Sequence, residues 1–128
     1  MTTLEFTNEL VYSGRKARVA VRLSTASPPI RIDMVLDSGA EVSVINRDFA
    51  APLGISDVTT GEAIELIVAN QDSRPAWIHQ IPIEVMGRSM MIEAAFCPDW
   101  DMANLLGLRG FFDQLVVAFD HANRRLYV

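Results

Sequence analysis

Short runs in which apolar and polar residues alternate limit this chain to folds built from β-strands. The first clear run places Val19, Val21 and Leu23 between polar or small residues. A period of two puts alternate side chains on opposite faces of a half-buried strand. Clusters of Gly, Pro, Asn and Asp separate the runs, as is typical of turns. The pattern predicts strands in residues 17–24, 28–38, 63–70, 76–86, 88–96, 114–120 and 124–128.

Helical patterns are brief. Residues 46–54 predict a turn or two of helix, and residues 108–115 predict a second short helix. Short strands at this spacing favour an all-β barrel or sandwich. The 128 residues contain no repeat, low-complexity segment or linker, so we expect one domain over residues 1–128.

The charge balance narrows the possible partners. The formal net charge is −5, and basic residues are scattered, which disfavours binding to nucleic acid or to an anionic membrane. No apolar run approaches the ~18 residues that span a membrane. The N-terminus has no basic start typical of a signal peptide, and Cys97 is the single cysteine. We therefore expect a soluble cytoplasmic protein with no nucleic-acid or membrane partner.

The sequence gives little support for a metal or cofactor site. His79 and His121 are the two histidines, and neither has a zinc-site spacing. Phosphate-binding loops and the Gly-x-Ser-x-Gly elbow are absent. Residues 13–16 match Ser-x-x-Lys, but they are typical of a turn rather than the helix start which that motif needs. We expect no metal and no cofactor.

Residues 37–40, Asp-Ser-Gly-Ala, lie between two apolar runs. Asp-Ser-Gly is most often a simple turn. A loop enclosed by buried strands must satisfy its polar groups internally, because each unpaired buried group costs about 1–3 kcal/mol. Ser38 can donate and accept, and Gly39 permits a close approach of a second strand. A catalytic loop is therefore an alternative to a turn.

Two motifs resemble the retropepsin-like aspartic proteases. Residues 35–45 resemble that family's catalytic loop, Asp-[Ser/Thr]-Gly-[Ala/Ser] between apolar strands, and residues 104–107, Asn-Leu-Leu-Gly, resemble the strand that passes this loop and leads into a helix. Residues 78–96 resemble the strand hairpin before the second motif. The resemblance implies an all-β, closed acid-protease barrel with a flap hairpin and one short helix near the C-terminus.

The resemblance also implies an aspartic endopeptidase. Such enzymes use two carboxylates that share one proton, so that one activates a water and the other protonates the scissile carbonyl. This chain has one Asp-Ser-Gly motif, so the second carboxylate would come from another copy. We expect a homodimer that acts on peptide or protein substrates, and whose two Asp37 carboxylates titrate in two separated steps.

Site roles follow from the resemblance by position. Asp37 would be the catalytic acid and base, Ser38 would hydrogen-bond the backbone of the partner subunit, and the Gly39 carbonyl would contact the substrate main chain. The substrate-binding residues that it implies are Ala40, Ile67, Val68, Ala69, Asn70, Gln71, Leu105, Leu106 and Gly107.

Some residues depart from the family pattern. The predicted flap tip, residues 69–72, has no glycine, and Leu108 stands where many members carry an arginine that pairs with an acid after the catalytic motif. Glu41 is the nearby acid, and Arg109 comes one position later. These departures leave open a dimeric peptide- or protein-binding module with little or no proteolysis. A third reading is an unrelated β-barrel in which residues 37–40 are only a turn.

Overall fold

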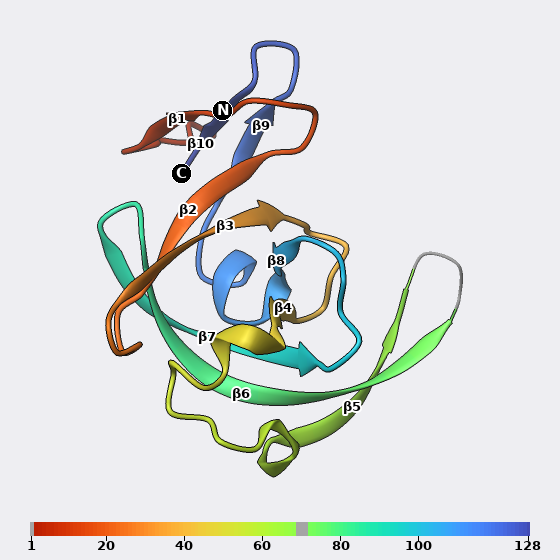
Figure 1. The fold of residues 1–128 in the computed structure, drawn as a ribbon. Coiled ribbons are helices and arrows are strands. Elements are labelled where there is room, and N and C mark those ends of the chain that lie inside the picture. Colours follow the sequence, from red (N-terminus) through yellow and green to blue (C-terminus); the bar gives the residue numbers. More distant parts are fainter. Residues whose placement is uncertain (1, 69–71) are drawn as a thin grey trace.

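The computed structural model describes residues 2–68 and 72–128 and consists mainly of strands (Figure 1). The strands are β1 (Glu9–Val11), β2 (Arg18–Leu23), β3 (Ile30–Leu36), β4 (Ser43–Asn46), β5 (Glu62–Ile67), β6 (Ser73–Val85), β7 (Arg88–Cys97), β8 (Asn104–Leu106), β9 (Ala118–Asp120) and β10 (Arg125–Tyr127). Short helical turns are η1 (Arg47–Phe49), η2 (Val58–Thr60) and η3 (Leu108–Phe112). The all-β prediction is confirmed.

One sheet closes on itself to form the barrel. Its strand order is β2-β3-β8-β4-β7-β6-β5. Because β2 also pairs with β6, the ring closes through β2, β3, β8, β4, β7 and β6. β3 runs parallel to β8, and β4 runs parallel to β7. β5 lies outside the ring and pairs with the first half of β6, and together they form a hairpin that extends beyond the barrel (Figure 1). This hairpin occupies the place of the predicted flap.

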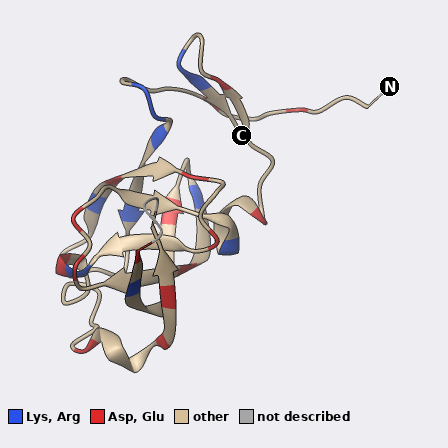
Figure 2. Ribbon diagram, turned by 90° about the vertical axis from the view of Figure 1, so that its right-hand side faces the viewer, with Lys and Arg blue, Asp and Glu red and all other residues tan. Residues whose placement is uncertain are grey.

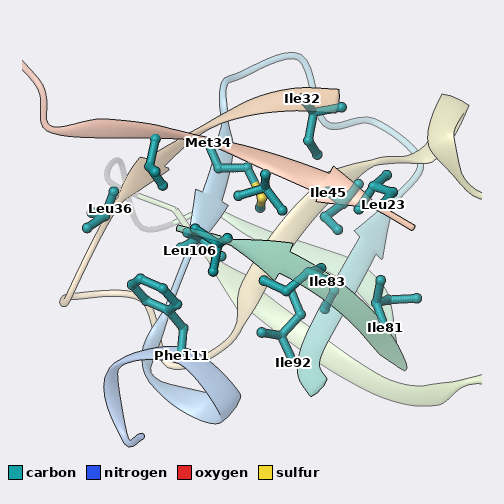
Figure 3. Close-up of a cluster of buried hydrophobic side chains, with 14 of the residues drawn as sticks. Leu23, Ile32, Met34, Leu36, Ile45, Ile81, Ile83, Ile92, Leu106 and Phe111 are labelled. Carbon is teal, nitrogen blue, oxygen red and sulfur yellow. The ribbon is translucent and has the colours of Figure 1, made fainter. Parts of the chain in front are cut away.

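The predicted alternation determines which side chains fill the barrel. Val19, Val21 and Leu23 are buried, whereas the residues between them are exposed. Aliphatic side chains from facing strands meet in the barrel interior, where Phe111 of η3 joins them (Figure 3). The labelled members of this cluster are Leu23, Ile32, Met34, Leu36, Ile45, Ile81, Ile83, Ile92, Leu106 and Phe111.

The predicted helix at residues 108–115 is shorter and less regular than expected. Helical backbone covers only Leu108–Phe112, and it is broken at Arg109 and Gly110. Gly110 has a φ of +88°, and a Cβ there would lie 2.6 Å from the Met91 carbonyl oxygen. The close approach to β7 therefore forces a kink that only glycine accommodates readily.

Two strands also differ from their predicted bounds. β6 begins at Ser73 and runs through Pro75, which pairs only with β5, so its missing N–H costs no bond to β7. The strand predicted at 114–120 is confined to β9, because Leu115 and Val117 pack against the barrel core instead.

A second, three-stranded sheet has the order β1-β10-β9 and gathers the two ends of the chain beside the barrel (Figures 1 and 2). Arg125 pairs with Glu9 at 2.6 Å across this sheet. Basic and acidic residues are interspersed along the ribbon of the barrel (Figure 2). Among the described residues, none of the helical segments has the length and apolar character needed to cross a bilayer.

Candidate active site

The Asp-Ser-Gly-Ala loop follows β3 and turns tightly toward β4. The Asp37 N–H donates to the Leu106 carbonyl at 2.9 Å, so β8 holds the start of the loop. Within the loop, the Ala40 N–H donates to the Asp37 carbonyl at 3.1 Å, and the Gly39 N–H donates to Asp37 Oδ1 at 2.9 Å. The segment is therefore a turn in its local geometry, but one that β8 fastens to the barrel.

The residues after β8 hold the far side of the same loop. The Gly107 N–H donates to the hydroxyl of Ser43, a fully buried side chain, at 3.0 Å. The next two N–H groups, of Leu108 and Arg109, donate to the carbonyls of Ala40 and Glu41 at 2.9 and 3.0 Å. Such a chain of bonds fixes the loop backbone on both sides and limits how far Asp37 can move.

A cavity of about 1000 Å³ opens beside this loop. Its apolar wall is a second cluster of buried side chains, distinct from the barrel core, to which partly buried residues of β5 and β8 add. The lining residues are Lys16, Asp37, Gly39, Ala40, Glu41, Val42, Val44, Ile64, Glu65, Leu66, Ile67, Val68, Arg74, Ile78, Trp100, Met102, Ala103, Leu105 and Arg109.

Six of the nine predicted site residues that the structure describes come together at this cavity. The lining includes Asp37, Gly39, Ala40, Ile67, Val68 and Leu105. Leu106 and Gly107 are buried behind the loop and support it, while Ser38 is exposed and does not line the cavity. The predicted residues Ala69, Asn70 and Gln71 fall outside the described part of the chain.

Asp37 differs from the other carboxylates of the cavity. Glu41 accepts a bond from Arg109 at 2.7 Å, and Glu65 accepts one from the Ser73 hydroxyl at 2.5 Å. Asp37 is half-buried and receives only the bond from Gly39, and no donor among the described residues reaches its Oδ2. One carboxylate oxygen is therefore available to a water or a substrate in the cavity.

In the family pattern, an arginine at the position of Leu108 pairs with an acid after the catalytic motif. In this chain, Arg109 makes the corresponding ion pair from one position later. Its guanidinium lies 2.7 Å from Glu41 and 3.7 Å from Glu93, so it joins the catalytic-type loop to β7. Its backbone is extended, with φ −70° and ψ 113°, which allows the N–H to bond the Glu41 carbonyl. Leu108, which precedes it, is 41% exposed.

The histidines have structural partners. His79 Nε2 donates to the Val58 carbonyl at 2.7 Å and packs edge-on against Phe96. His121 Nδ1 lies 2.5 Å from the Tyr12 hydroxyl, and the two residues directly follow β9 and β1. In residues 2–68 and 72–128, no three His, Cys, Asp or Glu side chains are grouped to hold a metal ion.

Sequence reasoning missed several lining residues, chiefly Lys16, Arg74, Trp100 and Met102. Trp100 is buried in the cavity wall, and its Nε1 donates to the Ala103 carbonyl at 3.0 Å. The available signal was a large aromatic residue between two aspartates, shortly before Asn-Leu-Leu-Gly.

Comparisons with known proteins agree with this geometry. A family model described as gag-polyprotein putative aspartyl protease matches residues 29–111. The structure is similar to that of a retropepsin-like aspartic protease from Rickettsia conorii, with 17% identity, a TM-score of 0.70, and coverage of 95% of this chain and 99% of that chain. It is also similar to the EIAV protease complexed with the inhibitor HBY-793, with 14% identity, a TM-score of 0.54, and coverage of 77% and 88%. No curated protein sequence matches the chain.

Proposed function

Because the chain belongs to the family of gag-polyprotein putative aspartyl proteases, we propose that it is a homodimeric aspartic endopeptidase in which each subunit supplies Asp37. The observation that carries this proposal is the position of Asp37 on a braced loop beside the cavity, with an Oδ2 to which no described residue donates a hydrogen bond. Peptide hydrolysis by this chemistry needs a second carboxylate, and Glu41 and Glu65 are each bound to another side chain. A second copy of Asp37 meets that need.

Exposed apolar side chains near the site favour a symmetric partner. Ile67 is 78% exposed and Met102 is 48% exposed, and both line the cavity. Leu108 is also exposed and follows the Gly107 backbone that braces the loop. Large apolar groups gathered at one site are typical of interaction surfaces. A second subunit placed over them would bring two cavities and two Asp37 side chains together.

The mechanism follows from two carboxylates that share one proton. The ionised Asp37 accepts a proton from a water, whose oxygen attacks the scissile carbonyl carbon, while the protonated partner carboxyl donates its proton to the carbonyl oxygen. Asp37, which now carries the proton from the water, donates it to the amide nitrogen as the C–N bond breaks, and the partner carboxylate takes a proton back from a hydroxyl of the tetrahedral intermediate as the new carboxyl group forms. Within each subunit, the Gly39 N–H orients the Asp37 carboxylate through Oδ1 and leaves Oδ2 for the water.

The site also suggests the class of substrate and the location. A cavity walled by aliphatic residues and Trp100 suits a peptide with apolar side chains at the cleavage site. Cys97 is a buried free thiol, so the fold needs no disulfide, and we place the protein in the cytoplasm on that ground.

One of the two observations that favoured a binding module with little or no proteolysis no longer supports it. One of its reasons was Leu108 in the arginine position, but Arg109 pairs with Glu41 at 2.7 Å from the next residue. Its other reason, the glycine-free flap tip, concerns residues that include 69–71, outside the described part of the chain. The unrelated-barrel reading is excluded by the family match and by the likeness of fold.

The decisive variant is Asp37→Asn, which keeps the size of the side chain and removes its acid–base chemistry. We expect cleavage of a peptide library to fall by at least about 100-fold while sedimentation still detects a dimer. The matched control is Asp33→Asn, on the strand β3 that precedes the Asp37 loop, where the carboxylate forms an exposed ion pair with Arg18 at 3.0 Å. Asp37→Asn with wild-type cleavage would refute the assignment.

A mixing experiment tests whether two chains form the site. Wild-type and Asp37→Asn chains, mixed in equal amounts and allowed to exchange, should retain about a quarter of the activity of the same total amount of wild type, because only wild-type pairs carry two carboxylates. A residual activity of about one half, the wild-type share, would mean that each chain acts alone.

A further inference from the structure

Arg74 lies where the β5–β6 hairpin meets the loop between β7 and β8, residues 98–103. It is in register with Leu66 across the hairpin, and both residues line the cavity. Arg74 Nη1 donates to the Asp99 carbonyl at 2.9 Å and lies 3.6 Å from Asp101 Oδ1. One side chain thus joins two walls of the cavity that are 25 residues apart in the sequence.

The loop at 98–103 is anchored on its opposite side by different contacts. Asn46 Nδ2 donates to the Trp100 carbonyl at 3.4 Å, and the Asn46 N–H donates to Asn104 Oδ1 at 2.7 Å. The first bond holds the loop to β4, and the second joins β4 to the start of β8, where the loop ends. Toward the hairpin, no side chain of β5 or β6 other than Arg74 makes a hydrogen bond or ion pair with the described residues 98–103. Trp100 also packs in one apolar cluster with Ala76 and Ile78 of β6, so Arg74 supplies the directional polar link between hairpin and loop and apolar packing supplies the rest.

We propose that Arg74 is a positioning residue that sets the width of the apolar pocket between Leu66, Trp100 and Met102. This inference rests on the proposed function, since the pocket is taken to hold an apolar side chain of the substrate. The bond to the Asp99 carbonyl is charge-assisted and directional, so it supplies most of the constraint. The Asp101 pair adds little, because that carboxylate is 82% exposed.

Fluorescence of Trp100 tests the constraint without any need for activity. Trp77→Phe leaves Trp100 as the single tryptophan. In that background, Arg74→Ala should raise the acrylamide quenching of Trp100 by about twofold or more, because the loop opens more often. Arg74→Lys, which keeps the charge and a donor, should recover part of the protection. If Arg74→Ala does not fold, Arg74→Gln, which keeps an amide donor, replaces it.

Kinetics test the consequence for substrate. With peptides that carry a bulky apolar residue at the cleavage site, Arg74→Ala should raise KM by about fivefold and change kcat by less than about twofold. With alanine at that residue, the KM change should be much smaller. The matched control is Arg22→Ala, which removes an exposed ion pair with Glu84 of β6 at 3.9 Å, away from the cavity.

The outcomes separate this inference from the proposed function. If Arg74→Ala matches Arg22→Ala in both quenching and KM, the positioning role is wrong. An equal fall in kcat for all peptides would also overturn it, since that result means a role in the chemical step. If the wild-type chain cleaves no peptide, the proposed function fails, and the quenching of Trp100 alone then decides whether Arg74 holds the loop.

Discussion

Gly107→Ala should damage the candidate site through a single added methyl group. The Gly107 backbone, with φ −114°, is open to any residue, so alanine brings no conformational strain of its own. Its Cβ would lie 2.5 Å from the Val42 carbonyl oxygen and 2.7 Å from that of Ala40. Both oxygens belong to the backbone that follows Asp37, so no side-chain rotation relieves the overlap. The loop itself must move.

The magnitude follows from two overlapping costs. Overpacking of a close-packed site costs about 1–3 kcal/mol. A shift of this backbone also stretches the 3.0 Å bond from the Gly107 N–H to the buried Ser43 hydroxyl, and an unpaired buried group costs about 1–3 kcal/mol. We expect the free energy of unfolding to fall by about 2–4 kcal/mol. We also expect folded protein to lose about 100-fold in kcat/KM, since a shift of about 1 Å misaligns reacting groups.

Urea unfolding and peptide cleavage measure these two effects. The control is Gly14→Ala, where no atom lies within 4 Å of the new Cβ and the cost comes only from the φ of +83°. That variant should lose about 1 kcal/mol of stability and none of its activity. If Gly107→Ala is no less stable than Gly14→Ala, or cleaves peptides at the wild-type rate, the close contact does not brace the site.

Two further substitutions probe polar contacts. Arg109→Ala should change the free energy of unfolding by less than about 1 kcal/mol, because its partners are partly exposed. It should lower kcat/KM by about tenfold, because it releases Glu41 next to the Asp37 loop, and an unchanged kcat/KM would contradict this role. Asp57→Ala should destabilise the fold at neutral pH, because the hydroxyl and N–H of Thr59 bond the Asp57 carboxylate and lower its pKa below the usual 3.8. A lowered pKa means that the stabilisation is present above pH 3.8 and is lost as the pH falls through the folded-state value. In urea unfolding, the free energies of wild type and variant should therefore converge in acid, and a difference that persists there would contradict the linkage.

The barrel strands were predictable because their burial pattern is local. In β2, the polarity of each residue indicates whether it faces the core or the solvent, and the buried residues are those that the alternation predicts. β1 could not be found in this way, since three residues are too few to show a period. It exists because Glu9 and Val11 pair with Tyr127 and Arg125 at the other end of the chain. That pairing depends on the closed barrel, which brings the two ends together.

The residues of the candidate site also separate into those that the sequence predicted and those that only the folded arrangement brings together. Asp37 and Gly107 belong to motifs whose order along the chain is informative, so the sequence predicted both. Arg74 and Trp100 meet at the cavity only because β6, β7 and the loop at 98–103 fold together. An arginine just before a predicted strand and a tryptophan between two aspartates have ordinary surface interpretations until that arrangement is known.

The one-residue offset of the arginine shows how a departure in sequence can leave geometry intact. The chain stays extended through Arg109, so its N–H pairs with the Glu41 carbonyl and its guanidinium reaches the Glu41 carboxylate. Gly110 then turns the backbone with a φ of +88°, which brings Phe111 into the barrel core. A residue with a Cβ at position 110 would strain this turn and collide with β7. Gly110 thus permits the displaced ion pair, and the offset leaves Leu108 exposed, where the proposed second subunit would cover it.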